Sequence, residues 1–252
     1  MSTFDLMAAL ALPDGALVDR RVPKMLLVEN GAPTARDKRR IREEVDELRW
    51  LAALKPTTVG VAAYGDPERE YREIAVLQLT LRPGARVGRI TELVHRAVPY
   101  PVLLATRQAH GPQLSLAHKR WSRGETGKTV LDGALIAVEL GNTAAVDAEI
   151  AFRDALAVPR QPRASLHALY QGWMDALLAL RVAAVTGVFL VPGPPEAATG
   201  RAAASLEYER LKCRIAELSA EGSKERQVRR LAELNLELNR LRTDLAAVRA
   251  RL

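Results

Sequence analysis

The chain has 252 residues, of which 48% are hydrophobic and 27% charged, enough for a packed core and too apolar for a disordered chain. Its net charge of +7 is compatible with nucleic-acid contact, but aromatic residues make up only 4%, which argues against a single-strand platform of stacked rings. One cysteine, Cys213, excludes a disulfide framework within the chain, and no two histidines have zinc-binding spacing, so we expect no cofactor and no metal.

The beginning of the chain shows no targeting or membrane segment. Residues 2–12 predict a short apolar helix without the basic stretch and long apolar core of a signal peptide. The most apolar run, 173–191, is interrupted by Asp175 and Arg181. We therefore expect no membrane span and a cytoplasmic protein.

The next segments predict an edge strand and a long helix. Residues 16–28 alternate loosely and contain Pro23, which suits the edge of a sheet. In 34–54, apolar residues recur at helical spacing, with Thr34 as the N-cap and Lys55-Pro56 as the stop. This pattern predicts one helix over 34–54.

The middle of the chain alternates between strands and helices. Strands are predicted over 73–81, 101–106, 114–121 and 130–140, and a helix over 87–98. The fold class expected is α+β, a mixed sheet with packed helices, followed by a C-terminal coiled-coil helical hairpin.

The stretch S-R-G-E-T-G-K-T, residues 122–129, ends like a phosphate-binding loop. Ser122 stands where that loop has its first glycine, and a strand with a bulge at Gly133 is predicted where a helix should follow. We interpret the stretch as a hairpin loop between two strands.

Other catalytic patterns are equally incomplete. Asp66-Pro67 reverses the first element of a metal-dependent nuclease motif, and no lysine stands two residues after Glu73. There is no nucleophile elbow for a serine hydrolase. No catalytic residue is predicted.

The chain from Ser165 onward is predicted to be mostly helical. A helix is expected from Ser165, with a short strand over 185–191. We divide the chain into a core domain over 1–190, a Pro/Gly linker over 191–200 and a helical hairpin over 201–252. Gly222-Ser223 separates two heptad-spaced seams, which face each other or a partner: Tyr208, Leu211, Ile215 and Leu218 in the first, and Leu231, Leu234, Leu238, Leu241, Leu245 and Val248 in the second.

Basic side chains offer the candidates for contact with DNA phosphates. They form two short runs and a third group that ends in the hairpin loop: Arg21 and Lys24; Lys38, Arg39 and Arg40; Lys119, Arg120 and Lys128. Binding through such residues would weaken steeply with salt.

The order of several motifs resembles one bacterial family. The motifs are R-V-P-K at 21–24, E-I-A-V-L-Q-L-T-L at 73–81, A-V-P-Y-P-V-L-L at 97–104, A-H-K-R at 117–120 and the E-R-Q-V-R-R-L-A-E-L-N-L-E-L-N-R-L tail. The chain resembles the family called domain of unknown function 4391 over nearly its whole length. The matching positions most relevant to function are Pro23, Lys24, Glu73, Pro99, Pro101, Lys119, Arg120, Gln227, Asn235 and Glu237.

The resemblance implies an accessory protein of phage-defence or restriction-modification-like loci, beside a helicase and a DNA methyltransferase. We therefore expect a non-enzymatic interaction subunit that docks through its C-terminal helices or self-associates through them. The alternative is a DNA-contacting accessory protein. A nuclease or nucleotide-using enzyme is the least favoured reading.

Overall fold

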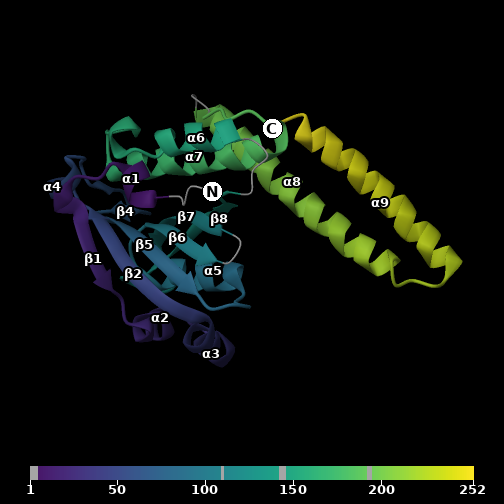
Figure 1. Ribbon diagram of the computed structural model, residues 1–252, viewed down its shortest axis with the longest axis horizontal. Helices are drawn as coiled ribbons and strands as arrows, with labels where there is room; N and C mark the ends of the chain where they lie inside the picture. The colour runs from purple at the N-terminus through teal and green to yellow at the C-terminus, as the bar shows by residue number, and fades with distance from the viewer. Residues whose placement is uncertain (1–4, 109–110, 142–145, 192–194) are drawn as a thin grey trace. The chain divides into compact units, whose positions relative to one another are not determined.

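The computed structural model describes residues 5–108, 111–141, 146–191 and 195–252, and the chain divides into two compact units between Leu177 and Leu178. The first unit contains a six-stranded sheet in the order β1-β2-β5-β6-β7-β8 (Figure 1). Its strands are β1 (Leu17–Arg21), β2 (Val45–Leu54), β5 (Ile74–Leu81), β6 (Val102–Gln108), β7 (Gly111–Trp121) and β8 (Thr129–Glu139).

Neighbouring strands are antiparallel except β5 and β6, which are parallel. Helix α5 (Val87–Ala97) joins this pair, because parallel strands need a crossover connection. The predicted α+β class with a mixed sheet is confirmed. A separate hairpin of β3 (Tyr64–Gly65) and β4 (Glu70–Tyr71) lies beside β7, where Trp121 N donates to Glu68 O at 2.8 Å.

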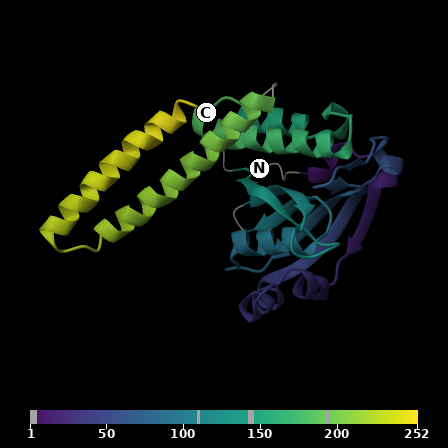
Figure 2. The ribbon, with the colours of Figure 1, turned by 180° about the vertical axis from the view of Figure 1, so that it is seen from behind.

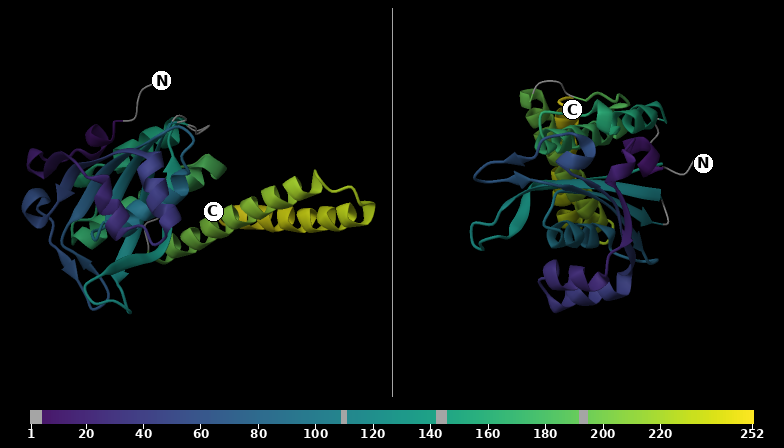
Figure 3. Two further views of the ribbon diagram at one scale, coloured as in Figure 1. Left: turned by 90° about the horizontal axis from the view of Figure 1, so that it is seen from below. Right: turned by 90° about the vertical axis from the view of Figure 1, so that its left-hand side faces the viewer.

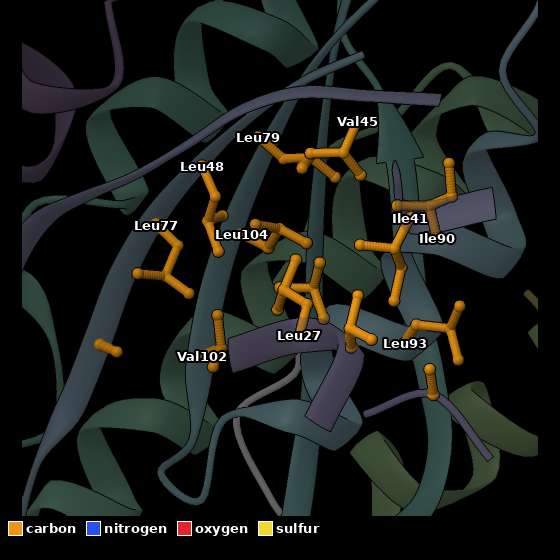
Figure 4. Packing of buried hydrophobic residues seen from close by; sticks show 14 residues of the cluster. Leu27, Ile41, Val45, Leu48, Leu77, Leu79, Ile90, Leu93, Val102 and Leu104 are labelled. Atoms are coloured by element: carbon orange, nitrogen blue, oxygen red, sulfur yellow. The ribbon is translucent and has the colours of Figure 1, made fainter. Parts of the chain in front are cut away.

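One face of the sheet is covered by α2 (Lys24–Asn30), α3 (Ala35–Glu44) and α5 (Figure 3). Apolar side chains from these helices meet those of β2, β5 and β6 in one core, in which Leu48, Leu77 and Leu104 are fully buried (Figure 4). The core holds these three helices on the sheet.

The other face carries α1 (Leu6–Leu10), α6 (Val146–Ala155) and the first part of α7 (Leu166–Thr186) (Figure 3). The Tyr170 hydroxyl accepts a hydrogen bond from Ala117 N at 2.9 Å and lies 2.8 Å from the Val102 carbonyl that it can donate to. Trp173 Nε1 donates to Leu156 O at 2.8 Å.

The first unit also contains short helical segments: η1 (Asp14–Ala16), α4 (Pro56–Val59) and η2 (Val158–Arg160).

The helix predicted over 34–54 is wrong in its second half. Thr34 is the N-cap as predicted, with its Oγ1 accepting from Asp37 N at 3.1 Å, but α3 ends at Glu44 and β2 begins at Val45.

Two irregularities in β2 explain this error. They lie between Val45 and Glu47 and between Trp50 and Ala52 in the pairing with β5. Each one shifts the alternation of side chains between the two faces of the sheet. Buried residues such as Val45, Leu48 and Ala52 then recur at a spacing of three and four, which imitates a helix.

The stretch S-R-G-E-T-G-K-T connects β7 to β8 as a hairpin loop, as predicted. Trp121 pairs with Thr129, and Ser122 N donates to Lys128 O at 2.8 Å. A strand follows the loop where a phosphate-binding loop requires a helix. Gly133, with φ +76°, lies where the register with β7 shifts, so the predicted bulge is also present.

The second unit contains the end of α7 together with α8 (Pro195–Gly222) and α9 (Val228–Arg249). Helices α8 and α9 run side by side as a hairpin (Figures 1 and 2). Two apolar clusters fill the space between them: Ala204, Tyr208, Leu211, Leu241, Leu245, Val248 and Leu252 in one, and Ile215, Leu218, Leu234, Leu238 and Leu241 in the other. The predicted helical hairpin is confirmed, with the seams facing each other.

The junction between the predicted domains is partly helical. Helix α7 continues to Thr186 and no strand follows it over 187–191, so the strand predicted there is wrong. Helix α8 begins at Pro195, inside the segment 191–200 predicted as a linker, of which 192–194 lie outside the described residues. Of the helices in the described segments, none is long and apolar enough to cross a membrane.

Candidate functional site

Two predicted cations, Arg21 and Lys24, lie where β1 leads into α2. The Arg21 side chain is 70% exposed and its Nε lies 3.9 Å from Glu47. Lys24 Nζ donates to the Val45 carbonyl, and burial, with the nearby charge of Arg82, lowers its pKa. Arg21 can therefore meet a solvent-borne partner, whereas Lys24 links α2 to β2.

The three basic residues Lys38, Arg39 and Arg40 of α3 also differ in exposure and pairing. Lys38 is exposed, and Arg39 is exposed but pairs with Glu43 at 2.8 Å. Arg40 is only 11% exposed and pairs with Glu44 at 3.0 Å. Exposed pairs of this kind contribute little stability, so Arg39 can exchange Glu43 for another anion, while Arg40 is held in place by its surroundings.

Lys119 does not belong to a nucleic-acid surface, and this prediction is wrong. Its side chain is 2% exposed and lies beneath α5, where Nζ donates to the carbonyls of His95, at 2.5 Å, and Val98. Burial lowers the pKa of Lys119 to about 7. Strand alternation directs Lys119 into the interior, which composition alone does not indicate.

Arg120 and Lys128 lie at the end of the β7–β8 hairpin and line the same pocket. The Arg120 guanidinium is 3.7 Å from Asp132, and Lys128 forms an exposed ion pair with Glu125. The pocket has a volume of about 570 Å³ and is also lined by Arg96 of α5 and by the connection between α2 and α3. We call it the hairpin pocket. It unites residues that are distant in the sequence, and the sequence did not predict it.

A second candidate site gathers three of the five tyrosines and two of the four histidines of this aromatic-poor chain. We define the histidine–tyrosine cluster as Tyr64, Tyr71, His118, His167 and Tyr170. The rings of Tyr64 and His167 are stacked at 4.8 Å, and those of His167 and His118 at 5.2 Å. Tyr71 meets His167 edge-on at 4.9 Å. The residues come from the β3–β4 hairpin, β7 and α7, so no local pattern could have revealed them.

His118 is fixed within this cluster by both ring nitrogens. Nδ1 lies 2.5 Å from the Tyr71 hydroxyl and Nε2 lies 2.9 Å from Gln171 Oε1. Because an amide oxygen can only accept, Nε2 carries the hydrogen and Nδ1 accepts from Tyr71. Burial lowers the pKa of His118 to about 4, so the ring is neutral at pH 7. Its role is to join β4, β7 and α7.

His167 differs from His118 because no hydrogen bond within the described residues uses its ring nitrogens. It is partly exposed, and its orientation is set by stacking between Tyr64 and His118. Burial, followed by the nearby charge of Arg69, lowers its pKa. A neutral, oriented imidazole of this kind can accept a proton or a hydrogen bond from a ligand.

Charged residues border the cluster on the β3–β4 hairpin. Asp66 begins the turn: its carboxylate accepts from Glu68 N at 2.7 Å, from Arg69 N at 2.6 Å and from the Tyr64 hydroxyl at 2.7 Å. Arg69 Nε donates to Asp132 at 2.8 Å. Asp66-Pro67 is therefore a turn sequence, with Asp and Pro in the first two positions. Its carboxylate oxygens are occupied by these hydrogen bonds.

The predicted partner-helix seam is used inside the chain. Its members in the two apolar clusters of the α8–α9 hairpin face each other, and Leu231 is partly buried near the turn. Ion pairs between Arg214 and Glu237 and between Arg230 and Glu221, both at 3.1 Å, connect the two helices. Cys213 is exposed on α8. A partner would therefore meet the outer faces of the hairpin.

No group of three or more His, Cys, Asp or Glu side chains within the described segments could hold a metal ion. One family matches most of the chain: it is described as "Domain of unknown function (DUF4391)" and the match covers residues 10–245. No curated protein and no solved structure matches the chain. The resemblance read from the motifs is thus confirmed at the level of the family.

Proposed function

Because the chain belongs to the family of the domain of unknown function DUF4391, we propose that it is a cytoplasmic, non-enzymatic accessory subunit of a prokaryotic antiviral defence or restriction-modification-like system. In this proposal the α8–α9 hairpin docks on the helicase or the DNA methyltransferase of the same locus. The first unit is the folded α+β domain of the subunit.

The outer sides of the two helices of the hairpin carry this proposal. The apolar residues of each seam pack against the other helix. Apolar residues outside the seams are therefore not needed for packing within the hairpin. Leu206 on α8 is 44% exposed and Leu236 on α9 is 68% exposed. Each lies two residues after a member of the apolar clusters between the helices, Ala204 and Leu234 respectively, and so points away from the partner helix. Because the two leucines point away from each other, each offers an apolar anchor for a partner protein on the outer side of its own helix.

Co-purification of the full-length chain with the helicase and the methyltransferase tests the proposal. The double variant Leu206→Glu, Leu236→Glu should abolish the complex, because it places a charge in the apolar contact on whichever side of the hairpin the partner docks. A matched control, Ala216→Glu with Ala247→Glu, adds the same charges at exposed positions on the same helices and should retain it. Circular dichroism should give equal helicity for both variants. A complex that survives the leucine variant would contradict docking through the hairpin.

A second function, contact with DNA phosphates, is favoured by α3. Among the described residues Arg36, Lys38 and Arg42 are exposed on this helix and take part in no ion pair. Free surface cations gain most from neutralising phosphates, because no existing pair must be broken. Gel-shift titrations over a range of salt concentrations test this. Lys38→Gln with Arg42→Gln should weaken binding and flatten its salt dependence, and Arg40→Gln should not.

A further inference from the structure

The hairpin pocket is bounded by three separate parts of the first unit: the connection between α2 and α3, the end of α5 and the β7–β8 hairpin. Its volume of about 570 Å³ lies within the range of small-molecule sites. Gly31 makes this arrangement feasible. A Cβ at Gly31 would lie 2.6 Å from Ala97 Cβ and 2.6 Å from the Leu93 carbonyl, so only glycine lets the end of α2 lie directly on α5.

The lining contains hydrogen-bond donors that suit a phosphate. Arg96 pairs with Glu92 at 2.8 Å, with 51% of the arginine side chain exposed. Lys128 pairs with Glu125, with the two side chains 69% and 60% exposed. Such exposed pairs contribute little, whereas hydrogen bonds from Arg or Lys to phosphate oxygens are strong. A phosphate can therefore replace the carboxylates as the partner of both cations.

The same pocket also contains acceptors. Ser122 Oγ accepts from Gly124 N at 3.3 Å and from Glu125 N at 3.2 Å, which orients the start of the loop. Glu29 and Asn30 line the pocket from the end of α2. A carboxylate and an amide are suited to the hydroxyls of a sugar and to the amino groups of a base. Cationic and acceptor side chains in one pocket of this size match a ligand that carries both a phosphate and a sugar or base.

From these contacts we propose that the hairpin pocket binds a nucleoside phosphate, with its phosphate on Lys128 and Arg96 and its sugar or base on Glu29. This site does not depend on the docking function proposed above. It also differs from a phosphate-binding loop, because Lys128 reaches the ligand from the base of a β-hairpin loop, directly before β8, and not from the N-terminus of a helix. The ligand is either a free nucleotide or a nucleotide of a DNA strand.

Isothermal titration of the full-length chain with AMP, ATP, inorganic phosphate and a short single-stranded oligonucleotide tests the proposal. Saturable binding of a nucleotide is expected, weakened about 10-fold or more by Lys128→Gln with Arg96→Gln, since a hydrogen bond to a charged group contributes about 1.5–3 kcal/mol. Arg123→Gln, an exposed cation of the same loop that does not line the pocket, should leave the affinity unchanged. Glu29→Gln should weaken the binding of nucleotides but not the binding of inorganic phosphate.

The outcomes separate the sources of the ligand. Binding of AMP or ATP that depends on Lys128 supports a free nucleotide, and binding of the oligonucleotide alone with the same dependence supports a DNA strand. Equal losses in Arg123→Gln and Lys128→Gln would overturn the proposal, because they would indicate non-specific attraction of polyanions. Absence of saturable binding of every probe would overturn it as well. Thermal unfolding of each variant without ligand controls for folding.

Discussion

Replacement of Lys119 by Met tests how the sheet holds α5. The side chain is 2% exposed, and Nζ donates to the carbonyls of His95, at 2.5 Å, and Val98. These carbonyls belong to the last turn of α5 and to its C-cap Val98, where a helix leaves acceptors unsatisfied and carries partial negative charge. Met is an unbranched side chain only one heavy atom shorter than Lys, and it donates no hydrogen bond.

Two opposing terms set the size of the effect. Burial lowers the pKa of Lys119 to about 7, so the charged form is costly in the folded state. The two carbonyls offset that cost by accepting hydrogen bonds, and each would lose about 1–3 kcal/mol without a donor. Because the neutral amine also donates, removal of the donor dominates. We expect Lys119→Met to lower the free energy of unfolding by about 2–4 kcal/mol at pH 7.

The difference in unfolding free energy between the wild type and this variant should also grow with pH. The folded pKa of Lys119 lies below the unfolded one, so between the two values the unfolded chain binds more protons and stability rises with pH. The Met variant lacks this contribution. The gap in unfolding free energy should therefore widen from pH 7 to pH 9, by up to about 2 kcal/mol.

Urea denaturation followed by circular dichroism at both pH values measures these effects, with the slope of the transition checked for constancy. Lys38→Met, at an exposed lysine of α3, is the control and should change stability by less than about 0.5 kcal/mol. If Lys119→Met equalled or exceeded the wild type at both pH values, the contacts between Nζ and the end of α5 would not be stabilising. The reasoning would then be refuted.

Three further substitutions probe other parts of the structure. The Arg89 guanidinium lowers the pKa of Asp37 to about 2, so the ion pair stabilises the folded state above pH 4 and this contribution is lost as the pH falls. In urea titrations Asp37→Asn should lower the free energy of unfolding by about 1–2 kcal/mol at pH 7. The variant should also lose less stability than the wild type below pH 4. Leu238→Ala should reduce stability by about 2–4 kcal/mol in thermal melts, because it opens a cavity between α8 and α9. Tyr71→Phe should cost about 1 kcal/mol in urea unfolding, and NMR titration of the wild type should show His118 neutral down to about pH 4.

Elements with one uninterrupted period were predictable from the sequence. In α5 the apolar residues Ile90, Leu93 and Val94 lie on one face, and they are the ones that enter the core. In the α8–α9 hairpin the heptad spacing was sustained, and Gly222 marked the end of α8. Each pattern is local, so it survives without knowledge of the rest of the fold.

The rest depended on contacts between distant segments. The periodicity of β2 was obscured by two irregularities that only the pairing with β5 reveals. The histidine–tyrosine cluster joins Tyr64 to His167, about a hundred residues later in the chain, and neither residue stands in a recognisable motif. The hairpin pocket likewise unites Glu29, Arg96 and Lys128. No single-sequence pattern encodes such distances, because they follow from the order of the strands.

The tetrapeptide Ala117–Arg120 shows how a basic run can mislead. Successive residues of a strand point to opposite faces, so His118 enters the histidine–tyrosine cluster while Lys119 lies beneath α5. The backbone of Ala117 bonds to the Tyr170 hydroxyl, and Arg120 lies near a carboxylate of β8. A nucleic-acid surface would require these side chains to face solvent together. Substitutions along the run should therefore affect stability through different neighbours at each position, and only at Arg120 should they affect a charge near the hairpin pocket.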